Sequence, residues 1–173
     1  MTYTTESAST FSSTRFDSST QFADAVPATI ALFKRLSVDD QLALLWYAYT
    51  EMGRSITPAA PGAARLQLAE GLLNQIKAMS HAEQLQVMRD LAANRNTAIS
   101  RAYGVLSANT KLAFWYELSV LMERGIVVPM PPGYRPSPAV TEVLEAIKSL
   151  DFGQQITVLR NAVIDMGVDP LAD

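Results

Sequence analysis

A seven-residue phrase that occurs four times constrains this chain more than any other feature. Its copies begin at Leu36, Met79, Leu106 and Leu150. The first and third copies lie 70 residues apart, and the second and fourth lie 71 apart. Two phrases therefore fall within each period, which predicts a tandem duplication of a unit of roughly 70 residues.

Each copy of the phrase has the chemistry of a helix start. The second residue of each copy is a strong N-cap type: Ser37, Ser80, Ser107 and Asp151. An acidic residue follows three positions after the first two caps, at Asp40 and Glu83, which is the spacing of a capping box. Thr110 and Gln154 are the weaker partners at the other two. The acidic pair Asp39-Asp40 is explained by capping and by the helix dipole.

Apolar residues recur at helical spacing after the caps, in the i, i+3, i+4, i+7 pattern of an amphipathic helix. The three clearest stripes are Leu42, Leu45, Trp46, Tyr49 and Met52; Leu112, Trp115, Tyr116 and Met122; and Ile156, Leu159, Val163 and Met166. Gly53, Gly125 and Gly167 are predicted to end these helices. Further helices are expected over 21–35, 62–78 and 138–149, with a shorter one near 97–104. No convincing strand pattern appears, so the predicted fold class is all-α, built from two related helical bundles.

Composition bounds the domain organisation and the function classes. Residues 1–20 hold twelve Ser or Thr, which predicts a flexible N-terminal arm. A single helical domain is expected over 21–168, followed by a short tail over 169–173. The net charge of -3 argues against nucleic acid. The longest apolar run, Leu42–Tyr49, is too short to span a membrane, and no signal peptide is recognised at the N-terminus.

No catalytic constellation is found. The chain has no cysteine and one histidine, His81, which follows a helix cap and is expected to be solvated. Disulfides, thiolate metal sites and cysteine nucleophiles are therefore excluded. The sequence predicts a protein that is not an enzyme.

The aromatic clusters have two interpretations. Trp46 and Tyr49 share one stripe, while Trp115 and Tyr116 lie on the duplicated counterpart. Such stripes are typical of plain core. They also suit a flat unsaturated ligand, because aromatic rings offer large faces and methionines such as those at 52, 88, 122 and 166 adapt to irregular apolar shapes.

Two further features have the same ambiguity. The segment 127–134 is apolar and rich in proline, which suits either packing on a core or the mouth of a pocket. Arg160 falls on an otherwise apolar stripe. It is either a snorkelling or internally paired arginine, or a guanidinium at a partner interface.

Several long stretches resemble one known family. They are Val26-Pro27-Ala28-Thr29-Ile30, the run from Asp40 to Gly53, Ala60-Pro61-Gly62-Ala63-Ala64, Lys111-Leu112-Ala113-Phe114-Trp115-Tyr116, and the run from Gly153 to Val163. Together they are similar to the N-terminal domain of the cyanobacterial orange carotenoid protein, over roughly residues 20–167. The chain stops at Asp173, where that protein would enter its linker and C-terminal domain. We therefore expect a stand-alone homologue, a helical carotenoid protein, rather than a truncated domain of the full protein, because the Ser/Thr-rich arm differs from that protein's start.

The resemblance implies two interleaved four-helix bundles from the duplicated unit, spanned by a ketocarotenoid such as canthaxanthin or echinenone. The positions that it implies for pigment binding are Leu42, Trp46, Tyr49, Met88, Leu112, Trp115, Met122, Met130, Pro131, Tyr134 and Val163. The implied function is photoprotection, in which the polyene quenches singlet oxygen by accepting its energy. The alternatives are a quencher that docks on the phycobilisome and a carrier that exchanges pigment with a homologue of the C-terminal domain.

Partners and departures follow from the same resemblance. Asn109 and Arg160 match positions that meet the C-terminal domain in the family, and the arginine also serves phycobilisome docking. A cytoplasmic location, peripheral at the thylakoid or phycobilisome, is implied. Ser119 stands where the family often has glycine, and Arg89 replaces a small apolar residue. Either change is expected to alter the pose or colour of the pigment.

Overall fold

The computed structural model describes residues 18–52 and 66–172. Over these ranges the chain forms α-helices and no strand. The helices are α1 (Ser18–Arg35), α2 (Val38–Met52), α3 (Leu66–Lys77), α4 (His81–Ala92), α5 (Ala98–Gly104), α6 (Ala108–Glu123), α7 (Pro138–Lys148) and α8 (Phe152–Ile164). The all-α prediction is confirmed. None of the described helices combines the length and the apolar character needed to cross a membrane.

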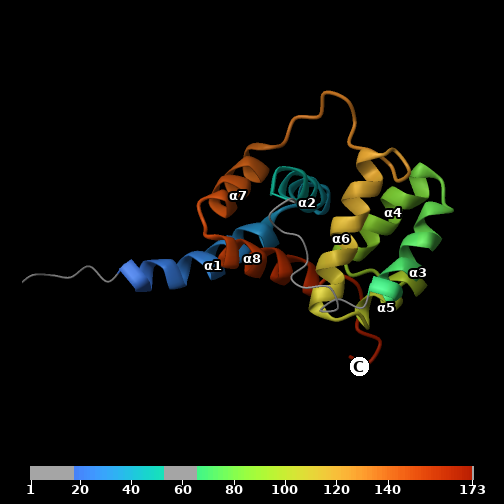
Figure 1. Ribbon diagram of the computed structural model, residues 1–173, viewed down its shortest axis with the longest axis horizontal. Helices are drawn as coiled ribbons and strands as arrows, with labels where there is room; N and C mark the ends of the chain where they lie inside the picture. Colours follow the sequence, from blue (N-terminus) through green and yellow to red (C-terminus); the bar gives the residue numbers. More distant parts are fainter. Residues whose placement is uncertain (1–17, 53–65, 173) are drawn as a thin grey trace, which may run out of the picture.

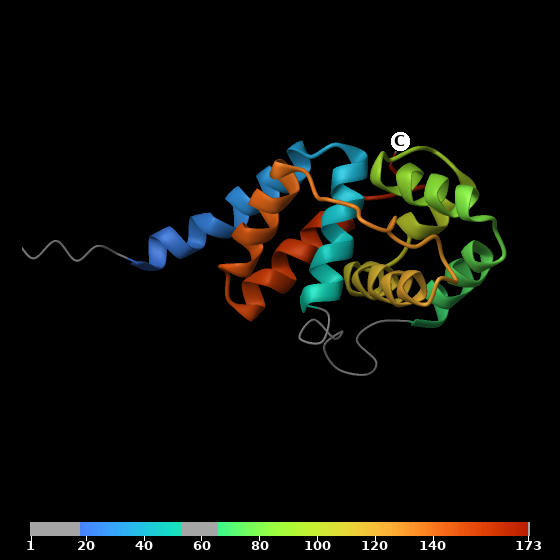
Figure 2. The same ribbon diagram turned by 90° about the horizontal axis from the view of Figure 1, so that it is seen from above.

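The helices form two bundles that meet along the centre of the molecule. Helices α1, α2, α7 and α8 pack together at one end, and α3, α4, α5 and α6 pack together at the other (Figure 1). Contacts of α2 with α4 and α6, and of α6 with α8, join the two halves. Seen from above, the first turns of α1 project beyond the helices of their own bundle (Figure 2).

The duplication explains this arrangement. The repeat offset relates α2 to α6 and α4 to α8, and by chain order it also relates α1 to α5 and α3 to α7. The contacts obey the same exchange: α2 packs on α7 as α6 packs on α3, and α2 packs on α4 as α6 packs on α8. Each bundle therefore combines the first two helices of one copy with the last two of the other, which is the interleaving that the resemblance implied.

The caps follow the sequence with two differences. Ser80 and Glu83 form a full capping box at α4. Asp151 forms an equally complete box at α8, where a weaker partner was expected. At α2 the Asp40 amide donates to the Ser37 hydroxyl, but the Asp40 carboxylate accepts from the hydroxyl of Ser137, the N-cap of α7. Tertiary contact thus diverts a side chain that the local pattern assigned to its own helix.

The helix ends also required corrections. Gly125, with φ +69°, ends α6 in a Schellman motif, in which its amide and that of Ile126 donate to the carbonyls of Met122 and Leu121. Gly167 does not end α8 in this way, because it lies two residues beyond the C-cap Asp165, whereas Gly125 directly follows the C-cap Arg124. The segment 18–20, expected within the flexible arm, belongs to α1. The rest of the arm and Gly53 lie outside the described residues.

The C-terminal segment fastens the two bundles together. The amides of Gly167 and Val168 donate to the carbonyls of Leu91 and Ser100, and the Asn94 side chain donates to backbone carbonyls of the same segment. The backbone approaches α5 so closely that a Cβ at Gly104 would collide with the Val168 carbonyl. Glycine is required at this crossing for close approach of two backbones.

Candidate functional site

An apolar pocket lies between α2, α4, α6 and the proline-rich segment that follows α6. Nine residues predicted for ligand binding line it: Leu42, Trp46, Tyr49, Met88, Trp115, Met122, Met130, Pro131 and Tyr134. Its volume is about 200 Å³, below the ~300–1,000 Å³ typical of ligand pockets. A long ligand would therefore use this pocket as one section of a longer path between the bundles.

Two predicted residues do not line this pocket. Leu112 and Val163 are buried in the core, and their backbone carbonyls accept the hydroxyl hydrogen bonds of Tyr49 and Tyr103, respectively. Both residues therefore support the pocket wall through these hydrogen bonds without lining the pocket themselves. The stripe methionines also divide, because Met88 and Met122 line the pocket whereas Met52 and Met166 do not.

A chain of hydrogen bonds fixes the Trp115 indole. Its Nε1 donates to the Tyr103 hydroxyl at 2.9 Å, and that hydroxyl donates to the Val163 carbonyl at 2.7 Å. Phe114 packs edge-on against both Tyr103 and Trp115. Burial raises the pKa of Tyr103 well above its usual range, so the hydroxyl keeps its proton and its donor role. Three helices, α5, α6 and α8, thus set the orientation of one pocket ring.

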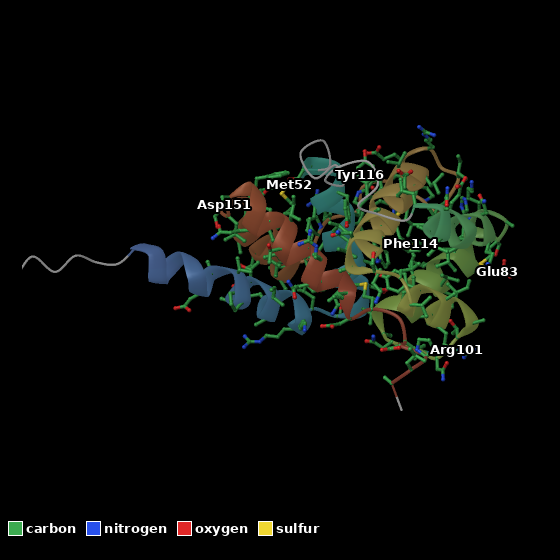
Figure 3. All side chains as sticks on the ribbon, turned by 60° about the horizontal axis from the view of Figure 1, so that its bottom comes forward. Met52, Glu83, Arg101, Phe114, Tyr116 and Asp151 are labelled. Carbon is green, nitrogen blue, oxygen red and sulfur yellow. The ribbon has the colours of Figure 1, made fainter. Side chains whose placement is uncertain are left out.

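Tyr49 is held in the same way from α2. Its hydroxyl donates to the Leu112 carbonyl at 3.1 Å, and its ring meets Tyr116 edge-on at 6.3 Å between centroids. Burial raises the pKa of Tyr49 far above its usual range. Figure 3 labels Tyr116 and Phe114 on α6; Tyr116 faces α2 and Phe114 faces α5. Phe114 and Tyr116, two residues apart on α6, therefore contact different bundles.

The proline-rich segment is shaped by its own sequence and by α4. Pro131-Pro132-Gly133-Tyr134 closes as a β-turn, in which the Tyr134 amide donates to the Pro131 carbonyl at 3.1 Å and Gly133 has φ +72°. Upstream, the buried Gln84 side chain accepts from the Val128 amide and donates to the Ile126 carbonyl. These hydrogen bonds hold in place the loop that forms one part of the pocket wall.

A charged pair stands at one mouth of the pocket. Arg89 of α4 donates from Nε and one Nη to the two carboxylate oxygens of Asp39, at 2.8 and 3.1 Å. These bonds raise the Arg89 pKa. Tyr134 lies at the same mouth, where burial and the neighbouring Asp40 and Asp39 raise its pKa. This mouth is polar, whereas the pocket behind it is apolar.

Sequence reasoning missed part of the lining. Ala43, Leu45, Leu85 and Leu118 also line the pocket. Leu45 was already on the first stripe, and Leu118 is one turn from Trp115, so helical spacing could have found both. The pairing of Arg89 with Asp39 had no sequence signal, because the residues lie 50 positions apart.

The predicted partner residues lie together at a separate place. Arg160 of α8 donates from Nε to the side-chain oxygen of Asn109 of α6 at 3.1 Å. Both residues are half-buried. The repeat offset relates this pair to Arg89 and Asp39, so the duplicated fold carries two arginine pairs at equivalent positions. Arg160 is internally hydrogen-bonded, and its role at a partner interface stays a prediction.

The site contains no arrangement typical of catalysis or metal binding. Over 18–52 and 66–172, no three His, Cys, Asp or Glu side chains gather to hold a metal ion. His81 is exposed at the start of α4, as predicted. The pocket offers aromatic faces, thioethers and a polar mouth, which suits binding an extended apolar molecule.

Comparison with known proteins gives one consistent result. Residues 19–169 match the family model described as "Orange carotenoid protein, N-terminal". An "Orange carotenoid-binding domain-containing protein" of Nostoc sp. strain PCC 7120 is 72% identical over all 173 residues, and the match covers 100% of both chains.

Solved structures agree. The orange carotenoid protein of Anabaena (Nostoc) sp. PCC 7120 binding canthaxanthin is 57% identical with a TM-score of 0.78, over 86% of this chain and 48% of that one. The red carotenoid protein of the same organism, also binding canthaxanthin, is 42% identical with a TM-score of 0.75, over 83% of this chain and 99% of that one. The chain thus spans about half the length of the first and nearly all of the second.

Proposed function

This chain belongs to the family of the orange carotenoid protein N-terminal domain, and we propose that it binds a ketocarotenoid without a covalent bond and protects against light damage. The observation that supports this proposal most directly is the pocket itself. Nine residues predicted from the sequence, drawn from three helices and one loop, converge on a single apolar cavity. A purely structural helical protein would be expected to fill such a cavity with its own side chains, because protein interiors are close-packed.

The lining suits a long polyene. The donors of Trp115 and Tyr49 are engaged by protein acceptors, so the rings present flat, apolar faces to the cavity. Burying apolar surface against them is favourable by about 25 cal/mol per Å² before the entropy of binding is counted. Met88 and Met122 adapt to a curved or tapered ligand. In this proposal Trp115 positions the polyene by stacking, and Tyr134 brackets an end ring.

A ketocarotenoid supplies low-lying excited states, which accept energy from singlet oxygen and release it as heat. The side chains of this chain supply no acid or base for that process. These side chains instead keep the pigment in solution, hold its conformation and separate it from other apolar surfaces.

Expression in a carotenoid-producing host tests the proposal. We expect a coloured protein from which a ketocarotenoid can be extracted, and which shortens the lifetime of singlet oxygen more than its apoprotein does. Trp115→Ala should lower the pigment-to-protein ratio or shift the absorption maximum, with Tyr47→Phe as the control outside the pocket. A colourless product from a host rich in ketocarotenoid would refute the proposal.

A second candidate function rests on the Arg160–Asn109 pair. Half-buried between α8 and α6, it presents a guanidinium that a protein partner could engage. In this proposal the partner is the phycobilisome or a homologue of the C-terminal domain, and the protein acts at the antenna as a quencher or exchanges pigment with the homologue. Fluorescence of isolated phycobilisomes would fall on addition of the pigmented protein, and less so with Arg160→Leu. Unchanged fluorescence would leave the singlet-oxygen role alone.

A further inference from the structure

The mouth formed by Arg89 and Asp39 has a geometry that the apolar pocket alone does not require. This pair lines the apolar cavity on one side. It also lines a second, more polar hollow with Ser37, Gln86 and Arg95 on the other. The pair therefore forms a wall where the apolar path ends and water begins. A ligand that follows the apolar cavity as far as this wall would meet the Arg89 guanidinium there.

The guanidinium at this wall is oriented and has donors to spare. The carboxylate of Asp39 engages Nε and one Nη of Arg89, which takes two of the five N–H groups that an arginine carries. The two side chains are 41% and 62% exposed, so the pair contributes little to folding stability. Its fork geometry instead fixes the direction of the N–H groups that remain.

Several other hydrogen-bond donors that line the cavity are already engaged by protein acceptors. The hydroxyl of Ser119 donates to the Tyr116 carbonyl, and Trp115 and Tyr49 donate to protein acceptors. Among the described contacts, neither the Tyr134 hydroxyl nor the Trp46 indole N–H makes a hydrogen bond, so both are competing donors in the lining of the cavity. Arg89 differs from them in carrying a full charge, and hydrogen bonds from a charged donor are roughly twice as strong as neutral ones.

We infer that Arg89, oriented by Asp39, is a specificity-determining residue that selects a carotenoid with an oxygen on its end ring over one with an unsubstituted ring. A ring carbonyl has lone pairs that accept from the guanidinium, whereas a hydrocarbon ring leaves the guanidinium partly desolvated with nothing in return. This inference rests on the proposed carotenoid binding. It adds that the protein recognises the oxygen on an end ring of the ligand, and that Arg89 is the residue that does so.

Competition between pigments tests it. The intact protein is produced in a host that makes canthaxanthin and β-carotene together, and the bound pigments are extracted and quantified. We expect the bound ratio of canthaxanthin to β-carotene to exceed the ratio in the host membranes. Arg89→Met should lower that enrichment by about two- to tenfold, the range expected for one hydrogen bond at a partly exposed site. Total pigment bound should stay close to that of the unaltered protein.

Three companion variants make the test decisive. Arg95→Met removes a positive charge near the same hollow without touching the apolar cavity, and should leave the enrichment unchanged. Arg89→Gln keeps a neutral donor and should retain part of it. Tyr134→Phe removes one competing neutral donor of the pocket wall and should lower the enrichment less than Arg89→Met does. Far-ultraviolet circular dichroism of each apoprotein checks that all remain folded.

The outcomes separate the two proposals. A coloured Arg89→Met protein with unchanged enrichment overturns the inference and leaves carotenoid binding intact. An unaltered protein without enrichment, or a loss of enrichment on Tyr134→Phe but not on Arg89→Met, also overturns it. Colourless protein throughout would remove the proposed function and the inference together.

Discussion

The hydrogen-bond chain behind Trp115 gives the sharpest quantitative prediction. In Tyr103→Phe the ring is kept, and with it the edge contact to Phe114, while the hydroxyl that links Trp115 to Val163 is lost. Tyr103 is 0% exposed and Trp115 4% exposed, so water cannot replace the missing oxygen without entering the core. The change therefore isolates one buried oxygen atom.

Loss of the Tyr103 hydroxyl affects its two hydrogen-bond partners, Val163 and Trp115, unequally. The Val163 carbonyl still accepts from the Met166 amide, so it keeps a partner. The indole N–H of Trp115 has no other acceptor among the described contacts, and a buried donor left unpaired costs about 1–3 kcal/mol. For a chain of this size, a loss near 2 kcal/mol lowers the melting temperature by about 4–8 °C.

Thermal and urea unfolding of the apoprotein measure this loss, and a double-mutant cycle assigns it. In a Trp115→Phe background no indole N–H is left to strand, so Tyr103→Phe should cost about 1–2 kcal/mol less there than in the unaltered chain. Tyr116→Phe is the matched control, because its hydroxyl makes no hydrogen bond in the described part of the chain. A cost below about 0.5 kcal/mol for Tyr103→Phe, or equal costs in both backgrounds, would refute the reasoning.

Three other predictions use internal controls of the duplicated fold. Gln84→Leu removes four hydrogen bonds and should destabilise the protein by about 2–4 kcal/mol in urea unfolding. Its counterpart Gln155→Leu removes two and should cost about half as much. Equal losses would contradict the view that the hydrogen bonds of Gln84 to the loop add stability. Gly104→Ala forces a collision with the backbone of the C-terminal segment and should lower the free energy of unfolding by about 1–3 kcal/mol or more. Gly71→Ala, in the open middle of α3, should raise it by about 0.5–1 kcal/mol. Thermal melts that rank the two variants the other way would disprove the close approach at Gly104. Raising the pH through about 10 should lower stability, because Tyr49 and the other buried tyrosine ionise in the unfolded chain while burial keeps them protonated when folded. The unfolded state then binds fewer protons, so the slope is negative, up to about 1.4 kcal/mol per pH unit for each tyrosine, and urea midpoints that stay flat above pH 10 would exclude the effect.

Helix starts and helix faces could be predicted because they depend on neighbours within one or two turns. Ser80 with Glu83 forms the predicted box, since both partners lie in the same turn. The stripe through Leu42, Trp46 and Tyr49 reaches the pocket for a similar reason: all three lie on one face of a single helix. Local spacing is sufficient wherever the contact is local.

Contacts between distant segments set the exceptions. Asp40 has the spacing of a capping-box partner, but its carboxylate accepts from Ser137 of another helix. Gly167 fits the pattern of a helix end, but a glycine is needed there because a Cβ would collide with the Tyr103 ring. In each case a residue type with more than one use was assigned by tertiary packing, which sequence spacing does not encode.

The duplication, the helix starts and the apolar faces follow from the sequence alone, and the family resemblance implied nine of the eighteen residues that line the pocket. Periodicity and capping are properties of short stretches, and the repeat offset can be read from the chain directly. The tertiary structure shows how the two copies exchange halves, as the resemblance implied, and that this exchange brings α2, α4 and α6 around one cavity. It also placed Arg89 against Asp39 at the mouth. A salt bridge between residues on different helices depends on how those helices pack, and packing is a property of the whole chain.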